Sequence, residues 1–266
     1  MSVRVLVLTG EGLNCESETA YAFKLAGANP QIIHVRDLFA KPDHLRDFQI
    51  LAITGGFSYG DHLGAGNVLA SMMKRYLGDE IERFIAADRL VIGICNGFQV
   101  LARTGILPGV SSPLKAQFSL ISNDVGSFEN RWVHLRVHPK STCLWTRGIE
   151  TLYLPVRHGE GKFFTPDTEL INHMENSGKI ALQYTSPDTQ NPVMEYPHNP
   201  NGSILSIAAV SNDRGNVLGM MPHPEAYLFE WQHPQYALYK GNQRLNLLES
   251  RGMALFKNAV KILEEN

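Results

Sequence analysis

The stretch Leu90-Val-Ile-Gly-Ile-Cys-Asn-Gly-Phe-Gln99 decides the fold of this chain. Its apolar, β-branched start predicts a buried strand, and the residues from Phe98 to Thr104 predict a helix. Cys95 stands between two glycines at the junction, in the G-x-C-x-G pattern of a nucleophile elbow. A helix N-terminus favours the reactive thiolate, so the pattern predicts a catalytic cysteine. A buried structural cysteine beside a tight βα turn is the alternative interpretation.

A histidine far along the chain has the chemistry that such a thiol needs. Pro222-His-Pro-Glu225 follows a second strand-like run, Val217 to Met221. Histidine takes and returns a proton near neutral pH, and a carboxylate fixes its tautomer. His223 and Glu225 are two residues apart, so in extended backbone both side chains lie on the same side. The pattern predicts Cys-His-Glu catalysis of acyl transfer, against the alternative of a proline-rich surface loop.

A glycine-rich segment supplies the third part of the predicted site. Thr54-Gly-Gly-Phe-Ser-Tyr-Gly-Asp61 follows the apolar run Ile50 to Ile53. Acyl transfer needs backbone N–H groups to stabilise a developing oxyanion. We assign this role to the amides of Gly56, Phe57 and Asn96. A phosphate-binding loop is disfavoured because the segment lacks G-x-x-x-x-G-K-[ST] and a well-placed G-x-G-x-x-G.

With these three elements the chain resembles the class I glutamine amidotransferases. More narrowly, it resembles the glutaminase subunit or domain of phosphoribosylformylglycinamidine synthases. The segments that carry this resemblance run nearly end to end: Gly12-Leu-Asn-Cys-Glu16, Gly55-Gly-Phe-Ser-Tyr-Gly-Asp61, Gly93-Ile-Cys-Asn-Gly-Phe-Gln99, Phe128-Glu-Asn-Arg-Trp-Val133, His158-Gly-Glu-Gly-Lys-Phe163, Asn199-Pro-Asn-Gly-Ser203 and Pro222-His-Pro-Glu225. One departure is Ala226, where the family pattern has arginine after His-Pro-Glu. It leaves the triad intact.

The resemblance implies a reaction. Cys95 attacks the side-chain amide of glutamine, His223 serves as base and acid, Glu225 orients it, and Gln99 helps to hold the glutamine. The ammonia passes to an ATP-dependent synthetase that converts formylglycinamide ribonucleotide to formylglycinamidine ribonucleotide in purine biosynthesis. The resemblance puts ATP and magnesium on that large subunit, in a complex with or without a small third subunit. It implies no cofactor and no metal in this chain.

Another histidine and glutamate pair competes with the predicted base. His158 and Glu160 are bracketed by glycines in His158-Gly-Glu-Gly161. By analogy with the family they support the active-site mouth or the synthetase interface, and an alternative base pair is the competing interpretation. Two other functions stay open for the whole chain: a stand-alone cysteine hydrolase of the elbow-cysteine α/β type, and a catalytically idle regulatory subunit. A glutamate-release assay with and without the synthetase separates them.

Composition predicts one globular domain over residues 1–266. The net charge of −2 argues against nucleic-acid binding, and no run approaches the ~18 apolar residues of a membrane span. The first residues lead directly into a strand-like run without space for a signal peptide, so we expect a cytoplasmic protein. Three separated cysteines give no disulfide or zinc spacing. We expect Cys15 to be a βα-loop residue that lacks a base, and Cys143 to be buried or partner-facing.

The order of apolar runs predicts an α/β fold with a mostly parallel central sheet and helices on both faces. Expected strands near 3–8, 31–35, 50–53 and 90–94 alternate with expected helices ending at 26 and near 68–76, 80–87 and 98–104. From 118 to 211 the chain is β-rich, with strands near 132–137, 151–156, 180–184 and 206–210. A last helix is expected over 245–264. Ligand sites of such sheets lie at the carboxyl ends of the strands, where Asn14, Gly56, Cys95 and His223 all fall.

Overall fold

One nine-stranded sheet runs through the computed structural model, which describes residues 2–109, 115–188, 191–239 and 252–265. Its strand order is β2-β1-β3-β4-β11-β10-β9-β6-β7. The first five strands of this order are mutually parallel: β2 (Asn29–His34), β1 (Arg4–Thr9), β3 (Ile50–Ile53), β4 (Leu90–Ile94) and β11 (Val217–Met220). β3, β4 and β11 are buried along their whole length, which explains their continuous apolar sequences.

The second half of the sheet is antiparallel. It consists of β10 (Ile207–Ser211), β9 (Ile180–Thr185), β6 (Glu129–Val137) and β7 (Thr151–His158). Two short strands, β5 (Ser119–Ile121) and β8 (Lys162–Phe164), form a separate antiparallel pair. This half is the β-rich extension that the sequence predicts, and it ends the sheet at β7.

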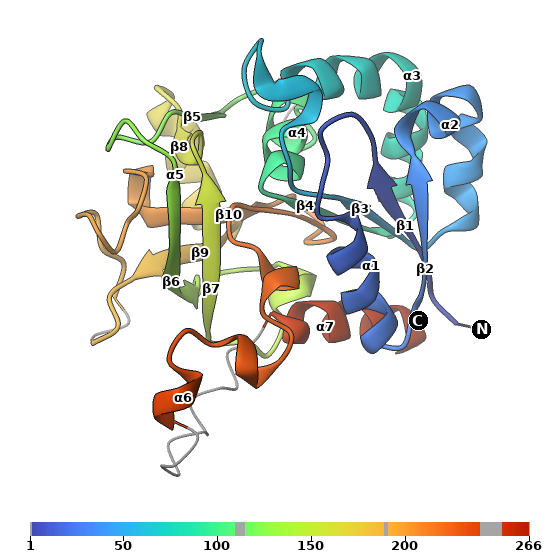
Figure 1. Cartoon of the computed structure of the whole chain (residues 1–266). Helices are drawn as coiled ribbons and strands as arrows, with labels where there is room; N and C mark the ends of the chain where they lie inside the picture. Colours follow the sequence, from blue (N-terminus) through green and yellow to red (C-terminus); the bar gives the residue numbers. More distant parts are fainter. Residues whose placement is uncertain (1, 110–114, 189–190, 240–251, 266) are drawn as a thin grey trace.

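Helices cover both faces of the parallel half. α3 (Asn67–Ala86) and α4 (Asn96–Thr104) lie on one side, and α1 (Glu16–Leu25) and α7 (Met253–Glu265) lie on the other (Figure 1). The remaining helices are α2 (Val35–Ala40), α5 (Thr168–Asn176) and α6 (Tyr236–Tyr239). Short 3-10 segments occupy Pro42–Asp47, Ser58–Asp61, Leu144–Thr146, Ile204–Ser206, Pro224–Ala226 and Glu230–Gln232. Within the described residues no helix is both long and apolar enough to cross a membrane.

The α/β fold class is confirmed, but some predicted helices are wrong. The two helices expected near 68–76 and 80–87 form the single helix α3, because Gly78 sits in the helix with no neighbouring atom within 4 Å of an added Cβ and does not interrupt it. The helix α5, which was not predicted, lies in the region expected to be β-rich. Its N-cap is Asp167, whose carboxylate accepts the Leu170 N–H at 3.0 Å. Of the last predicted helix, residues 245–251 lie outside the described part.

Candidate active site

The strand order brings the two halves of the predicted triad together. β11 lies beside β4 in parallel register, with Gly219 opposite Gly93 and Met220 opposite Ile94. Parallel neighbours end at the same edge of a sheet, so Cys95 follows β4 where Pro222 and His223 follow β11. The β1 and β3 loops reach the same edge, and the strand order reverses between them (Figure 1). This crevice is where open α/β sheets bind ligands.

Cys95 occupies the predicted elbow between β4 and α4. Its backbone has φ 52° and ψ −104°, a conformation that L-residues rarely adopt. The Cys95 N–H donates to the Met220 carbonyl at 2.8 Å, and its thiol points toward the Arg157 carbonyl at 3.5 Å. Gly97 is required because an added Cβ would lie 2.0 Å from the Ile53 carbonyl oxygen. The turn therefore presents the thiol at the carboxyl edge of the sheet.

His223 and Glu225 form a buried pair. His223 Nδ1 lies 2.6 Å from Glu225 Oε1, and their side chains are 3% and 1% exposed. Burial alone would lower the pKa of the His223 imidazole, but the Glu225 charge and the Cys95 and Cys15 thiols outweigh it and raise this pKa well above its usual value. The imidazole therefore favours its protonated form beside the thiols, as a general acid requires. The backbone N–H of His223 donates to the Pro155 carbonyl at 2.8 Å, which fixes the loop after β11 to β7.

The loop after β3 is paired with the loop after β1. The Phe57 N–H donates to the Gly12 carbonyl at 2.7 Å, and the Asn14 N–H donates to the Gly55 carbonyl at 3.1 Å. Gly56 has φ +138°, and a Cβ added there would lie 2.4 Å from the Gly12 oxygen. The Phe57 N–H is thus already hydrogen-bonded to Gly12 and does not point to an oxyanion in this conformation. Of the three amides that we assigned to the oxyanion hole, those of Gly56 and Asn96 remain as proposed donors.

Gln99 and Asn96 form a hydrogen-bonded network at the start of α4. The side-chain amide of Asn96 donates from Nδ2 to Gln99 Oε1 at 2.9 Å, and its Oδ1 accepts the backbone N–H of Ser58 at 3.2 Å. The Gln99 amide donates to the Glu160 carbonyl at 2.6 Å. The Glu160 carboxylate accepts the Ala65 N–H at 3.2 Å. Glu160 therefore links Ala65, just before α3, to Gln99, the residue that the resemblance assigns to glutamine binding.

His158 is buried next to the predicted triad. Its Nδ1 lies 3.1 Å from Asn123 Oδ1, whereas its buried Nε2 has no hydrogen-bond partner among the described residues. Burial, helped by the positive charge of His223, lowers the pKa of His158 to about 3. This imidazole is therefore neutral near pH 7, and among the described residues no carboxylate is hydrogen-bonded to it as Glu225 is to His223.

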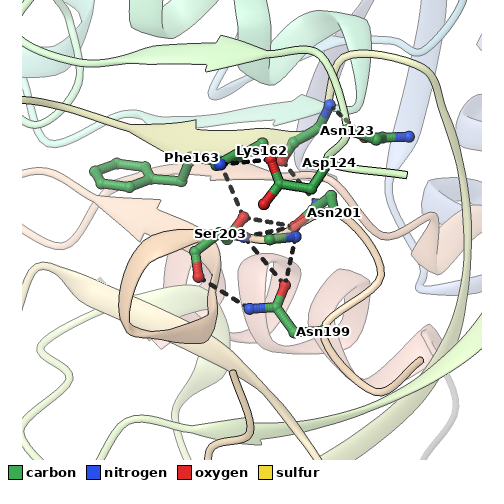
Figure 2. Close-up of polar contacts among 9 residues, drawn as sticks. Asn123, Asp124, Lys162, Phe163, Asn199, Asn201 and Ser203 are labelled. Atoms are coloured by element: carbon green, nitrogen blue, oxygen red, sulfur yellow. Dashed lines mark hydrogen bonds and ion pairs between the residues drawn. The ribbon is translucent and has the colours of Figure 1, made fainter. Parts of the chain in front are cut away.

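A buried amide cluster holds the turn that carries His158 and Glu160. Figure 2 shows hydrogen bonds among Asn199, Asn201 and Ser203, with Asn123 to one side of this group. Asn201 donates to the Gly161 carbonyl at 2.8 Å, and the Phe163 N–H donates to Ser203 Oγ at 2.9 Å. The Gly161 N–H donates to Asn123 Oδ1 at 3.1 Å. The Asn199-Pro-Asn-Gly-Ser203 segment thus fixes the active-site rim from within.

Cys15 is the site residue that sequence reasoning missed. It precedes α1, as expected for a βα loop, but it does not lack a base, because its thiol lies beside His223 and Glu225. Burial raises the pKa of Cys15, and the neighbouring imidazole partly opposes this. Only its place in the Gly12-Leu-Asn-Cys-Glu16 segment pointed to it. In the described part of the chain, Cys15, His223 and Glu225 are the one set of three such side chains close enough to share a metal ion.

The arrangement is suited to acyl transfer. It combines a thiol on a strained turn, an imidazole held by a carboxylate, and backbone amides from a glycine-rich loop at one sheet edge. A thioester formed on Cys95 has a base beside it to activate water.

Comparison with known proteins gives a family match and close relatives. Residues 2–263 match the CobB/CobQ-like glutamine amidotransferase domain. The phosphoribosylformylglycinamidine synthase subunit PurQ of Dehalococcoides mccartyi is 44% identical over 97% of each chain. The same subunit of Methanococcus maripaludis is 38% identical over 98% of each chain.

Solved structures share the fold. A chain of the PurLQS structure from Thermotoga maritima aligns with a TM-score of 0.72 and 27% identity, covering 99% of this chain and 100% of that one. A glutamine amidotransferase from the same organism aligns with a TM-score of 0.53 and 14% identity, covering 100% and 98%.

Proposed function

Since this chain belongs to the CobB/CobQ-like glutamine amidotransferase family, we propose that it is the glutaminase subunit of phosphoribosylformylglycinamidine synthase. The observation that carries this proposal is the match to PurQ subunits over nearly the full length of both chains. The elbow cysteine and the buried His223–Glu225 pair support it independently, because they supply what amide hydrolysis needs.

The reaction begins with attack of the Cys95 thiolate on the carboxamide carbon of glutamine. The backbone amides of Gly56 and Asn96, together with that of Phe57 once it turns away from the Gly12 carbonyl, stabilise the oxyanion that forms on the carboxamide oxygen. His223 gives its proton to the leaving nitrogen, ammonia departs, and a thioester remains on Cys95. His223 then takes a proton from water, which attacks the thioester and releases glutamate. Glu225 keeps the imidazole in the tautomer that both steps require.

The ammonia is used by the synthetase partner. That subunit converts formylglycinamide ribonucleotide to formylglycinamidine ribonucleotide, with ATP and Mg²⁺ bound to it and no cofactor bound to the present chain. The chain assembles with this large subunit, with or without a small third subunit, and the name of the Thermotoga maritima structure, PurLQS, supports such a complex. We place the protein in the cytoplasm and treat residues 1–266 as a single amidotransferase domain.

The test is reconstitution with the synthetase. The full chain is mixed with the purified large subunit, ATP, Mg²⁺ and formylglycinamide ribonucleotide, and formylglycinamidine ribonucleotide is measured with glutamine as the only nitrogen source. We expect product only when both proteins are present, together with one glutamate per product. Glutamate release that is fast without the partner and unaffected by it would favour a stand-alone cysteine hydrolase instead.

A further inference from the structure

His158 belongs to a turn that is fixed to the catalytic site, although the reaction as written gives it no role. The carbonyl of the preceding residue, Arg157, lies 3.5 Å from Cys95 Sγ. Two residues after His158, the Glu160 carbonyl accepts the Gln99 amide at 2.6 Å. Both ends of the turn therefore contact residues of the site. His158 itself is buried, so its imidazole is enclosed by the protein between these two contacts.

The hydrogen bonds of Asn123 determine which nitrogen of His158 carries the proton. Asn123 donates from Nδ2 to the Ser127 carbonyl at 2.9 Å and to the His158 carbonyl at 2.8 Å, so its Oδ1 is an acceptor. This oxygen accepts the Gly161 N–H at 3.1 Å and lies 3.1 Å from His158 Nδ1. Nδ1 must therefore donate, which leaves Nε2 of the neutral ring as an acceptor.

The Nε2 atom of His158 is a buried acceptor that makes no hydrogen bond within the described part of the chain. Such an atom destabilises the protein unless a small donor molecule reaches it. A Cβ atom added at Gly161 would lie 2.3 Å from Nδ1 and 2.4 Å from Cε1 of the ring, so the Gly161 backbone closes this part of it. Nε2 lies on the edge that does not face Asn123. Its partner must be small and must carry an N–H or O–H group.

The neutral state of His158 suits one small donor in particular, ammonia. Burial and the positive charge of the nearby His223 lower the pKa of His158 to about 3, so its ring holds no second proton near pH 7. An imidazolium ion would convert ammonia to ammonium, which has no lone pair and cannot attack the substrate of the synthetase. A neutral Nε2 instead accepts an N–H from ammonia and leaves the molecule nucleophilic.

We propose that His158 Nε2 accepts a hydrogen bond from the ammonia released at Cys95 and holds it, unprotonated, for transfer to the synthetase. When the tetrahedral intermediate collapses, its C–N bond breaks, His223 supplies the third proton on nitrogen, and the carbonyl of the thioester re-forms. No proton passes to His158, which contacts ammonia only through this hydrogen bond. The inference rests on the proposed function, since that function supplies both the ammonia and its acceptor.

Nitrogen tracing in the assembled complex tests this role. His158→Asn keeps an amide nitrogen near the position of Nδ1, where it can donate to Asn123, but has no acceptor at the position of Nε2. His158→Gln, the matched variant, brings its amide oxygen to that position. Each complex receives glutamine with heavy nitrogen in its amide, together with excess unlabelled ammonium. We expect His158→Asn to release roughly two- to tenfold more glutamate per labelled product than wild type, the effect of one lost hydrogen bond. His158→Gln should lose less coupling.

The outcomes of this experiment are distinct. Equal coupling in wild type and His158→Asn would overturn the proposal. An equal loss of coupling in both variants would also overturn it, because the shape of the ring and not its acceptor would then matter. Synthesis from ammonium alone should be the same for all three complexes, since the synthetase is unchanged. If the wild-type complex made no product from glutamine, the proposed function itself would be wrong.

A second measurement needs neither catalysis nor a His158 variant that folds. The full chain carrying Cys95→Ala is labelled at its histidine nitrogens, and the backbone-assigned ring of His158 is followed by NMR as ammonium chloride is added above neutral pH. We expect an Nε2 resonance of the unprotonated type that shifts saturably, whereas sodium chloride leaves it unchanged. A protonated Nε2 would overturn the proposal. So would an Nε2 that does not respond to ammonia, because water alone would then be its partner.

Discussion

The backbone of Cys95 has a conformation that costs a non-glycine residue about 1–3 kcal/mol. Its amide is bonded to the Met220 carbonyl on β11, and Gly97 packs directly against the Ile53 carbonyl on β3. The two neighbouring strands of β4 therefore hold the strained turn in place. In this turn the Cys95 thiol lies 3.5 Å from the Arg157 carbonyl oxygen.

Replacing this nucleophile separates the two half-reactions. In the assembled complex, Cys95→Ser should abolish synthesis from glutamine and leave synthesis from ammonium salts largely intact, because the synthetase carries the ATP chemistry. Product formation with each nitrogen source measures this. An electrophilic glutamine analogue should label Cys95, detected by peptide mass spectrometry. Modification of Cys15 or Cys143 in its place would show that the nucleophile is misassigned.

The two buried histidines should differ in their effect on hydrolysis. His223→Ala removes the proposed acid and base, and such losses typically reduce rates ~10²–10⁴-fold. His158→Ala removes a neutral imidazole whose Nδ1 lies beside Asn123 Oδ1 and not beside a carboxylate of the described chain. We expect it to act mainly on the coupling of glutamate release to synthesis. The measurement is glutamate release by each variant with and without the partner. A larger loss of hydrolysis for His158→Ala would mean that the base is wrong.

The buried His158 should make the fold sensitive to acid. Its pKa is about 3 in the folded chain and near 6.5 when unfolded, so between these values the unfolded state binds an extra proton. This contribution to stability is therefore complete above about pH 6.5 and is lost as the pH falls toward 3. Urea unfolding at pH 7 and pH 5 should show a larger loss of stability for wild type than for His158→Gln. Equal losses would show that His158 does not titrate on unfolding.

At the residue scale, sequence reasoning is strongest where chemistry and turn geometry are local. Cys95, His223 and Glu225 each have a chemical role that their neighbours in the chain support, and the structure brings them together. Cys15 had no such neighbour. Its partner His223 is more than 200 residues away, and only the folded sheet makes the contact visible. The orientation of the Phe57 amide was equally hidden, because Gly12 on another loop fixes it.

At the element scale, the loops after β1 and β3 act as one unit. They touch backbone to backbone, through a Leu13–Gly56 bridge flanked by two hydrogen bonds. A Cβ on either side of this contact has no space: one added at Gly12 would lie 2.1 Å from the Phe57 oxygen, and one added at Gly56 would lie 2.4 Å from the Gly12 oxygen. Each of the two motifs therefore requires glycine because the backbone of the other lies directly against it.

A pair of substitutions tests this contact. Gly56→Ala adds a methyl group at φ +138° against the Gly12 carbonyl, whereas Gly27→Ala adds one at φ +96° with no atom within 4 Å. Both should lose about 1–2 kcal/mol of stability from backbone strain. Gly56→Ala should lose more and should also reduce glutamate release by the complex. Thermal unfolding and the glutaminase assay measure the two effects. Identical stability and activity for the two variants would contradict the packing argument.

Strand positions were predicted better than helix boundaries. The runs 50–53 and 90–94 match β3 and β4 residue for residue, because both strands are completely buried and leave an uninterrupted apolar signal. α3 was divided in the prediction, since a glycine within a helix, here the partly exposed Gly78, resembles a break when tertiary packing is unknown. β5 and β8 were missed because three-residue strands carry no periodic signal.

At the scale of the whole molecule, the position of β11 determines the site. This strand comes from the last fifth of the chain, yet it lies between β4 and β10 at the centre of the sheet. It therefore joins the parallel half to the antiparallel half and brings His223 to the elbow. The sequence shows that β11 exists, but strand order depends on long-range pairing that no local pattern encodes. The proximity of Cys95 and His223 was thus inferred from chemistry rather than from topology.

The conformation of the loop after β3, which carries the Gly56 and Phe57 amides, suggests how the synthetase could control glutamine hydrolysis. The Phe57 N–H is bonded to the Gly12 carbonyl, so one of the three assigned donors is unavailable. The Phe57 ring is 47% exposed and lies 6.2 Å from the Phe128 ring, which is also half exposed. A protein that docks on these two rings contacts the same residue whose amide must turn inward. Ammonia made without an acceptor is wasted, which favours such coupling.

We therefore predict that the isolated chain is a poor glutaminase and that the synthetase activates it. One misdirected donor reduces rates ~10²–10³-fold, so rotation of the Gly56–Phe57 peptide is a sufficient switch. Binding of the synthetase with its ribonucleotide would shift the population toward the inward state. Glutamate release is measured for the chain alone, then with the partner, then with an ATP analogue and formylglycinamide ribonucleotide added. Phe128→Ala should weaken activation while leaving the low basal rate unchanged. Equal turnover under all conditions would exclude the switch, because the oxyanion hole would then be complete without the partner.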